Sequence, residues 1–239
     1  MIKFENVSKF FGRDFVAVDN VNVEVEEGKI YGFLGPNGAG KTTTLKMLTG
    51  VLTPDKGKIN INGFDITQNP IEAKKEFAFV SDDPDMFLKL KGIEYLNFIG
   101  KIYKVDELDL KQNIFKYSKL FEMEDALNDK IESYSHGMRQ KINIIAALIH
   151  EPKIWILDEP LTGLDPKSSF TLKQMMREHA DNGNIVLFST HVLEVAEKVC
   201  DHVFIINKGK IIYNGEMGAL KNNTDSSLEE IFLELVSDE

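Results

Sequence analysis

A glycine-rich loop that runs into a lysine and threonines is the clearest chemical signal in the chain. The stretch GPNGAGKTT follows an apolar run and precedes a helical pattern, and its spacing is G-x-x-x-x-G-K-[ST]. Glycines let backbone N–H groups converge on phosphate oxygens, and the N-terminus of the following helix adds a favourable dipole. An ordinary glycine-rich turn does not explain the lysine and the hydroxyl. The predicted phosphate-binding residues are Gly35, Pro36, Asn37, Gly38, Ala39, Gly40, Lys41, Thr42 and Thr43.

Two residues of this loop are expected to act on the terminal phosphates. Lys41 supplies a point charge beside them, and Thr42 offers a hydroxyl to Mg²⁺. This local charge matters because the chain has 28 Lys and Arg residues against 38 Asp and Glu residues, a formal net charge of −10. Such a balance disfavours a nucleic-acid partner, whose phosphate backbone requires clustered cations. An anionic ligand must therefore be held by the geometry of the loop.

Two adjacent carboxylates end the apolar stretch IWILDEP. Burying bare carboxylates is costly, so their position at the end of a buried strand indicates a metal ion or a polarised water near the phosphate loop. Asp158 is expected to hold Mg²⁺, in part through water, and Glu159 to orient or activate the attacking water. The alternative is a strand end with two solvated acids. Beside a phosphate loop, magnesium-dependent hydrolysis of a nucleoside triphosphate explains the pair better than nucleotide storage does.

These residues need a sheet to bring them together, and the apolar pattern predicts one. Alternating residues in IKFENV and VNVEVEEG indicate half-exposed strands, and the apolar run at 30–34 indicates a buried strand before the loop. Beyond Pro152, the buried strands IWILD and NIVLFST enclose the helical stretch SSFTLKQMMREHA. Strands that alternate with helices predict a parallel sheet with crossover connections, and hence an α/β fold.

Other segments are expected to extend this sheet. Turn pairs predict hairpins about Asn62-Gly63 and Lys208-Gly209. Between residues 88 and 150, apolar residues recur every three or four positions, which predicts an inserted helical subdomain. An amphipathic helix is expected near the end of the sequence, with one apolar stripe formed by Leu228, Ile231, Phe232 and Leu235.

Composition also indicates the cellular compartment of the chain and whether it can span a membrane. The longest nearly apolar stretch, INIIAALI, is too short to cross a bilayer, and no signal peptide is expected. The one cysteine, Cys200, excludes an internal disulfide, fits a reducing cytosol and reads as a small apolar side chain. We therefore expect a soluble chain whose membrane role, if it has one, depends on a partner.

In order along the chain, the motifs resemble those of the nucleotide-binding domain of ATP-binding cassette (ABC) transporters. GPNGAGKTT matches Walker A, SHGMRQ a variant signature, IWILDEP Walker B, LTGLD the D-loop and STH the switch, and the resemblance covers essentially the full chain. It implies a P-loop NTPase (RecA-like) core with a parallel sheet, an antiparallel β region and an inserted α-helical subdomain. Within one ABC ATPase domain, the core is expected at 1–87 and 151–220, the helical subdomain at 88–150 and the C-terminal helix at 221–239.

The resemblance implies an activity and partners. Members of this family bind and hydrolyse ATP with Mg²⁺. Two such domains stack head to tail, with each ATP between Walker A of one subunit and the signature of the other. The expected partners are therefore a second cassette, in a homodimer or a heterodimer, and an integral membrane permease that carries the substrate. The chain would then be cytoplasmic and peripheral on the cytoplasmic face of the membrane, with no nucleic acid as a partner.

The stretch SYSHGMRQK fits the signature role physically. Ser135 is a plausible N-cap, and its hydroxyl and the Gly137 N–H are placed to meet a γ-phosphate across a subunit interface. The usual family string is Leu-Ser-Gly-Gly-Gln, of which only the serine and the second glycine are retained here. His136 is either an added phosphate contact or an exposed residue at the helix start, and the second interpretation is favoured because neutral histidine adds little charge at pH 7.

The resemblance gives roles to two further residues. Asp165 in LTGLD is expected at the subunit interface, where it aligns the two ATP sites, and it is also an acid at a helix start before Pro166. His191, after the strand NIVLFST, is expected to reach the γ-phosphate and to hold Glu159 and the attacking water in place.

Two positions are less settled. Phe11 occupies the place where the family puts an aromatic ring under adenine; Phe10 is the neighbouring alternative, and either ring could belong to the core. Asp82 stands where the family has the Q-loop glutamine, and an ionised carboxylate can still bind Mg²⁺ or water but cannot donate a hydrogen bond. Just beyond it, Met86 and Phe87 belong either to the helical-subdomain core or to a groove that receives the permease.

The signature variant SHGM and the tail LEEIFLEL resemble most the subfamily that serves multispan export permeases, including antibiotic and peptide exporters. One alternative is an ABC ATPase that acts on DNA or ribosomes, although such members insert long coiled coils or carry two cassettes, which this sequence does not. Another is a regulatory module with little turnover, which the departures at Asp82 and His136 leave open.

Overall fold

A six-stranded, mainly parallel sheet forms the centre of the computed structural model, which describes residues 1–12, 14–222 and 228–237. Neighbouring strands follow the order β10-β9-β3-β8-β7-β6, and only the β9/β10 pair is antiparallel. Five of the strands are mostly apolar and buried because helices or a second sheet cover their faces, whereas the edge strand β10 has no buried residue. The strands are β3 (Lys29–Leu34), β6 (Phe77–Val80), β7 (Ile154–Asp158), β8 (Ile185–Thr190), β9 (His202–Asn207) and β10 (Lys210–Glu216).

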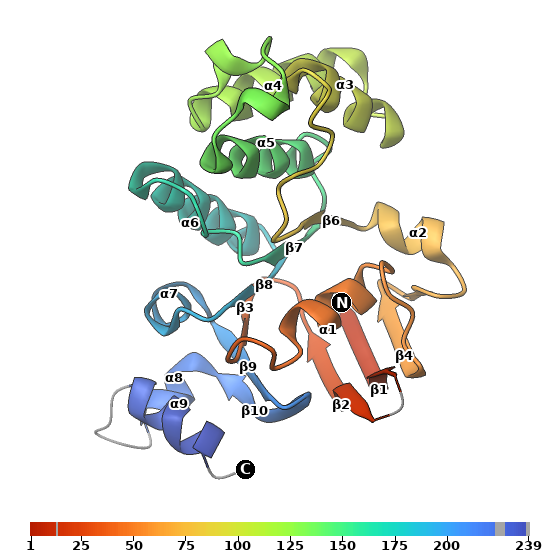
Figure 1. The fold of residues 1–239 in the computed structure, drawn as a ribbon, viewed down its shortest axis with the longest axis vertical. Coiled ribbons are helices and arrows are strands. Elements are labelled where there is room, and N and C mark those ends of the chain that lie inside the picture. The colour runs from red at the N-terminus through yellow and green to blue at the C-terminus, as the bar shows by residue number, and fades with distance from the viewer. Residues whose placement is uncertain (13, 223–227, 238–239) are drawn as a thin grey trace.

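A second, antiparallel sheet of order β2-β1-β4-β5 lies beside the central one (Figure 1). Both hairpin predictions agree with the structure. Asn62 and Gly63 turn between β4 and β5 with φ angles of 49° and 89°, and Lys208 and Gly209 turn between β9 and β10 with φ angles of 44° and 82°. The strands of this sheet are β1 (Ile2–Phe11), β2 (Phe15–Val25), β4 (Lys56–Ile61) and β5 (Phe64–Asp65).

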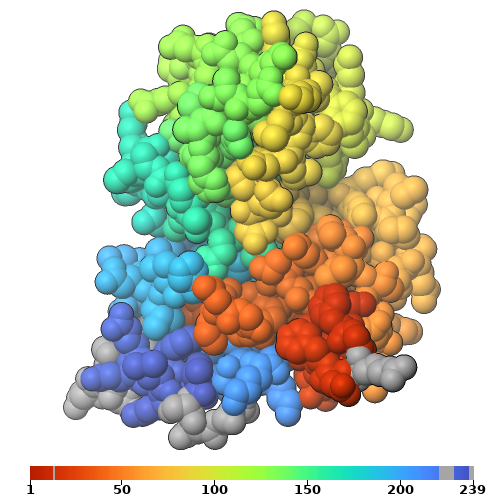
Figure 2. Space-filling model, in the orientation of Figure 1, coloured from red at the N-terminus to blue at the C-terminus, as the bar shows by residue number. Residues whose placement is uncertain are grey.

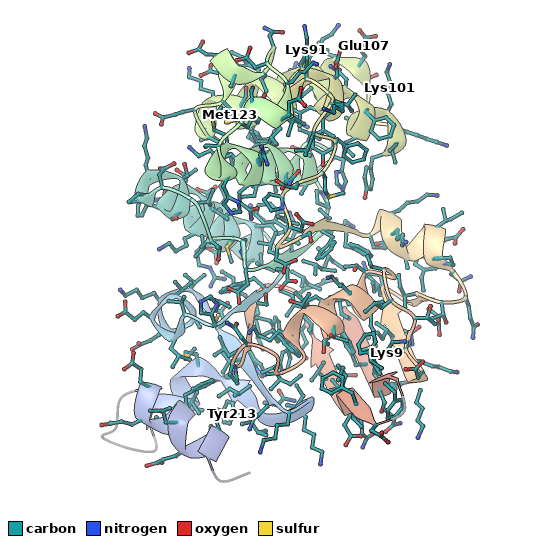
Figure 3. All side chains as sticks on the ribbon, viewed as in Figure 1. Lys9, Lys91, Lys101, Glu107, Met123 and Tyr213 are labelled. Atoms are coloured by element: carbon teal, nitrogen blue, oxygen red, sulfur yellow. The ribbon has the colours of Figure 1, made fainter. Side chains whose placement is uncertain are left out.

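Three α-helices and two short 3₁₀ turns gather at one end of the molecule, away from the antiparallel sheet (Figures 1 and 2). The labelled residues Lys91, Lys101, Glu107 and Met123 all lie in this helical part, whereas Lys9 and Tyr213 lie toward the other end (Figure 3). The elements of the helical part are α3 (Gly92–Ile102), α4 (Glu107–Leu120), η1 (Glu124–Ala126), η2 (Ile131–Ser133) and α5 (His136–Leu148).

The remaining helices flank the central sheet. Three of them follow loops that carry predicted site residues: α1 follows the glycine loop, α6 follows the D-loop and α7 follows the switch. These helices are α1 (Lys41–Leu48), α2 (Pro70–Lys75), α6 (Pro166–Asp181), α7 (Leu193–Val199), α8 (Met217–Asn222) and α9 (Leu228–Ser237). None of the helices within the described ranges is long and apolar enough to span a membrane.

Alternate side chains of each central strand enter different hydrophobic clusters. On β7, Trp155 and Leu157 pack with the helical part, whereas Ile154 and Ile156 pack with α1 and the antiparallel sheet. A fully buried side chain of this size contributes about 1.5–3 kcal/mol to folding, so both faces of the sheet are tightly held. The sheet is therefore a rigid support for the loops at the carboxyl ends of its strands.

Only part of the predicted C-terminal stripe can be placed. On α9, Ile231 is buried and Phe232 and Leu235 are partly buried, so these three share a covered face, while Leu233 is exposed. The Leu228 side chain lies outside the described residues.

Candidate functional site

The glycine loop Gly35–Thr43 connects β3 to α1 and owes its shape to close backbone contacts. Gly40 precedes α1 with a φ of 111°, and a Cβ there would lie 2.6 Å from the Ala17 carbonyl oxygen. At Gly35, a Cβ would collide with the Ile206 carbonyl. Side chains at these two positions would push the loop away from β2 and β9, so glycine is required for the loop to lie where it does.

Lys41, the first residue of α1, is folded back onto this loop. Its Nζ donates to the Gly35 carbonyl over 2.7 Å and to the Pro36 carbonyl over 3.3 Å, and its side chain is only 6% exposed. Burial lowers the pKa of Lys41, and the nearby Glu159 and Asp158 carboxylates oppose that shift. The loop thus holds a buried ammonium group beside the N-terminus of a helix.

Asp158, at the end of β7, is fully buried and only half satisfied. Its Oδ1 accepts a 2.5 Å hydrogen bond from the Ser189 hydroxyl, whereas Oδ2 forms no hydrogen bond with any described residue. Burial raises the pKa of Asp158, although the Ser189 and Thr42 hydroxyls lower it. Thr42 is thus near enough to stabilise the carboxylate without forming a well-aligned hydrogen bond to Oδ2.

This arrangement fits Mg²⁺. An orphaned, buried carboxylate oxygen beside the Thr42 hydroxyl leaves an oxygen ligand facing the phosphate loop. The described residues contain no cluster of three or more His, Cys, Asp and Glu side chains that could hold a metal by themselves. Mg²⁺ is usually bound by one or two protein oxygens, with water and phosphate as its other ligands, so it suits such a sparse site.

Glu159 lies where the chain leaves β7, in a left-handed conformation with a φ of 48°. Its Oε1 is 3.0 Å from His191 Nδ1 and 3.8 Å from Lys41 Nζ. The His191 ring therefore fixes the carboxylate, as one part of its predicted role requires. The backbone N–H of Glu159 donates to the Ser189 hydroxyl over 3.0 Å.

Ser189 is a site residue that we did not identify from the sequence. Its hydroxyl binds Asp158 and Glu159 together, and the side chain is fully buried. The sequence contains only an indirect indication of its role, since Ser189 precedes the switch histidine, His191, by two residues. In the structure, the register of its strand places it opposite Asp158. Only the parallel pairing of β7 with β8 makes the two residues neighbours.

A cavity of about 290 Å³ lies between the glycine loop and the start of β2. Asp82 reaches this cavity from the end of β6, where Ser81 donates to its Oδ1 over 3.3 Å. Burial is the main cause of the raised pKa of Asp158, and negative charge on Asp82 adds to it. The cavity is lined by Phe15, Ala17, Asn37, Gly38, Gly40, Lys41, Thr42, Thr43, Asp82 and Glu159.

The aromatic ring in this lining is Phe15, which corrects the placement expected for Phe11. The two residues pair across the β1/β2 hairpin, but only Phe15 lines the cavity, and its side chain is 60% exposed. Phe11 instead lies under the ammonium group of Lys9, 5.7 Å from the ring centroid. Directly paired residues of a hairpin present their side chains to the same face, so the pleat does not separate these two; Phe15 lines the cavity because it lies on β2, the strand that also contributes Ala17.

His191 lies behind Glu159 rather than in this cavity. Both side chains line a second cavity of about 350 Å³, together with residues of the D-loop and α6. Glu159 thus forms part of the wall between the two cavities. The predicted contact of His191 with a γ-phosphate would have to pass the Glu159 carboxylate.

The signature residues lie outside the nucleotide cavity. Ser135 is the N-cap of α5, and its Oγ accepts from the Met138 N–H over 3.3 Å. The ring of His136 packs against Gly163 of the D-loop, and a Cβ on Gly137 would lie 2.7 Å from the Gly163 carbonyl oxygen. His136 is exposed at the helix start, where its ring covers the D-loop.

Asp165 is the N-cap of α6 and accepts from the Ser168 N–H over 2.9 Å and its hydroxyl over 2.8 Å. Its Oδ2 also forms a 2.7 Å ion pair with Lys141 of α5. Lys141 and the two Ser168 hydrogen bonds hold the pKa of Asp165 well below its usual range. The acid at the helix start is thus confirmed, and Lys141 is a partner that the sequence did not suggest.

Met86 and Phe87 line an apolar groove of about 450 Å³ between the helical part and α1. Both side chains are partly exposed, at 45% and 41%, and the Phe87 ring also stacks on Tyr95 at 5.0 Å. Both residues thus face the groove and lie outside the core of the helical part, and reception of a permease by this groove stays a prediction.

Comparison with known proteins identifies relatives across most of the chain. A model of the family described as ABC transporter matches residues 18–162. The ABC transporter ATP-binding protein NatA of Bacillus subtilis is 36% identical over 219 residues, which cover 91% of this chain and 89% of that protein. Nod factor export ATP-binding protein I of Cupriavidus metallidurans is 33% identical over 216 residues, covering 90% of this chain and 71% of its own length.

A solved structure agrees with this likeness. The ATP-binding subunit of an ABC transporter superposes with a TM-score of 0.93 at 29% sequence identity, covering 98% of this chain and 99% of that one. The α/β fold with an inserted helical part is therefore confirmed.

Proposed function

Because the chain belongs to the ABC transporter family and is an ATPase of that family, we propose that it dimerises around two ATP molecules and energises export by a separate permease. The observation that carries this proposal is that the site is divided. Lys41, Thr42 and Glu159 line one cavity, whereas Ser135 and Gly137, at the N-terminus of α5, do not line it. A second copy of the chain would complete the site.

The residues suggest how hydrolysis proceeds. Thr42 and Asp158 would hold Mg²⁺, with Asp82 lining the cavity beside Thr42, and the bound ion would supply positive charge to the phosphates. Lys41 would exchange its two carbonyl acceptors for phosphate oxygens. Glu159 would accept a proton from the attacking water while the water oxygen bonds to the γ-phosphorus and the P–O bond to the ADP leaving group breaks. His191 holds the Glu159 carboxylate in position for that transfer.

The apolar groove is the proposed contact with the membrane subunit. Its exposed Met86, Phe87, Phe98 and Ile102 side chains offer a surface for a short apolar segment. Contact there would place the chain at the cytoplasmic face of the membrane. Export is the proposed direction because the sequence resembles export cassettes and one relative is named for Nod factor export.

The two departures from the family pattern, Asp82 and the His136 ring over the D-loop, bear on the alternative of a low-turnover regulatory module. Asp82 still offers an oxygen ligand in the cavity, and His136 leaves Ser135 and Gly137 at the outer end of α5. The arrangement therefore favours turnover. Since one chain supplies every motif of an ATP site, a homodimer is the simplest assembly, and a heterodimer with a related cassette is the alternative.

Two variants of the full chain test this proposal. Glu159→Gln removes the proton acceptor, so Mg²⁺-ATPase activity should fall by about a hundredfold or more, while sedimentation should show an ATP-dependent dimer. Adding Ser135→Arg should abolish that dimer and leave ATP binding by the monomer largely intact.

The outcomes separate the alternatives. Absence of ATPase activity in the unmodified chain, even with a co-purified permease, would favour the regulatory module. A dimer that survives Ser135→Arg would show that SHGM is only a helix start. Co-purification with ribosomes or DNA, and with no multispan membrane protein, would contradict the transport role.

A further inference from the structure

Three consecutive residues at the start of α5 each hold a different functional loop. Arg139 contacts the segment after Asp82, Gln140 contacts the exit from β7, and Lys141 contacts the D-loop. These residues directly follow the signature, so the helix that carries Ser135 is tied to three parts of its own subunit's ATP site.

The first contact is made by Arg139. Its Nη1 donates to Asp85 Oδ1 over 2.6 Å, and its Nη2 donates to the Glu132 carbonyl over 2.9 Å. One turn farther along, Asn143 Nδ2 donates to the Pro84 carbonyl over 3.2 Å. The guanidinium therefore joins α5 both to the 82–87 segment and to the turn that precedes the signature.

The 82–87 segment connects the cavity beside the glycine loop to the apolar groove. Its first residue, Asp82, lines the nucleotide cavity, and its last two, Met86 and Phe87, line the apolar groove. Asp85, between them, holds the signature helix through Arg139. The Arg139–Asp85 ion pair therefore connects this segment directly to α5.

The contact with the D-loop is made by Lys141 on the other side of the helix. Its ammonium group pairs with Asp165, and its side chain is only 12% exposed. Gln140, which is buried, donates to the Pro160 carbonyl over 3.4 Å. The packing of His136 and Gly137 against Gly163 adds van der Waals contact at the same place. The D-loop cannot shift far without moving the signature.

We propose that Arg139 and Lys141 are positioning residues that set the placement of the signature helix from the Q-loop segment and D-loop of its own subunit. This inference rests on the proposed function, in which the signature binds ATP held by the second subunit. Through these two side chains, the state of one ATP site would control how well the signature meets the other ATP. Neither side chain lines the nucleotide cavity, so both act through the helix.

The test uses the full chain with Glu159→Gln, so that ATP is retained in the dimer. In this background, Arg139→Met and Asp85→Asn should each weaken ATP-driven dimerisation by about fivefold to tenfold. The double variant should be no weaker than either single variant, because both changes remove the same contact. Sedimentation velocity over a concentration series gives the dimerisation constant, and titration with a fluorescent ATP analogue at low protein concentration gives the affinity of the monomer.

The second contact is tested separately. Lys141→Met should weaken dimerisation to a similar extent, and its effect should multiply with that of Arg139→Met because the two contacts are independent. Arg139→Lys keeps the charge but not the fork to two acceptors, so it should restore part of the loss. ATP affinity of each monomer should stay within about twofold of the parent, because the cavity is untouched.

Lys111→Met is the matched control, since it removes an exposed 2.6 Å ion pair with Glu107 on α4 and should leave dimerisation unchanged. The proposal is wrong if Arg139→Met and Lys141→Met lower the melting temperature but leave the dimerisation constant as it was. If the Glu159→Gln parent does not dimerise with ATP, the proposed function fails and this inference fails with it. If the Glu159→Gln parent dimerises with ATP and Ser135→Arg blocks that dimerisation, the proposed function holds, and the Arg139 and Lys141 variants then test the positioning role alone.

Discussion

Ser189 Oγ donates to Asp158 Oδ1 over 2.5 Å across neighbouring parallel strands, and the same oxygen accepts the backbone N–H of Glu159. The Ser189 hydroxyl thus orients Asp158, the proposed magnesium ligand, and holds the backbone N–H of Glu159, the residue proposed to activate water. The Thr42 hydroxyl also lies near this carboxylate, but Ser189 is the hydrogen-bond donor to Asp158 Oδ1 among the described residues.

Ser189→Ala should lower kcat for ATP hydrolysis by about tenfold to a hundredfold, the usual cost of losing a group that orients a metal ligand. It should also lower the free energy of unfolding by about 1–3 kcal/mol, because a buried carboxylate oxygen loses its donor. Steady-state kinetics and urea denaturation measure the two effects. Ser133→Ala, at an exposed hydroxyl that donates to Lys130 O, is the control and should change neither.

Asp158→Asn should stabilise the nucleotide-free protein at neutral pH while it reduces Mg²⁺-ATPase activity by about a hundredfold or more. Burial raises the pKa of Asp158 above 3.8, so the folded state binds this proton more tightly than the unfolded state does. The stability that Asp158 contributes is therefore present below 3.8 and is lost as pH rises through the folded-state pKa. Thermal melting from pH 4 to 8 without Mg²⁺ should show a weaker decline with rising pH in the variant than in the parent. An equal or steeper decline would contradict this origin of the shift.

Gly40→Ala should lower the free energy of unfolding by about 1–3 kcal/mol and weaken ATP binding, because its Cβ would press on the Ala17 carbonyl and its φ of 111° is strained for alanine. Gly38→Ala separates the two causes. Its φ of 81° is also left-handed, but a Cβ there meets nothing within 4 Å, so it should cost less stability. Equal losses would show that backbone strain alone accounts for the effect.

Phe15→Ser should weaken ATP binding by about threefold to tenfold, the range expected when a stacked or apposed ring is removed. Phe11→Ser should change ATP affinity less, since Phe11 does not line the cavity. Binding of inorganic triphosphate, which has no base, should be the same in both variants. A larger loss in Phe11→Ser would restore the original expectation for that residue.

Local patterns predicted the elements and the chemistry of the site. The glycine loop at Gly35–Thr43 and the DE pair at 158–159 depend on residues that are close in sequence, so their backbone requirements and charges can be read directly. The same holds for the hairpins at Asn62-Gly63 and Lys208-Gly209 and for the N-caps Ser135 and Asp165, because each is formed within a few residues.

Tertiary structure decided which of these local features meet. The partnership of Ser189 with Asp158 follows from the register of β7 and β8. Phe15 lines the cavity and Phe11 does not, because β2 is the strand of that hairpin that borders the glycine loop. The pairs Arg139–Asp85 and Lys141–Asp165 join segments that are 54 and 24 residues apart in the chain. No short-range pattern specifies such pairs, because they form only when packing against one sheet brings the loops to the same helix.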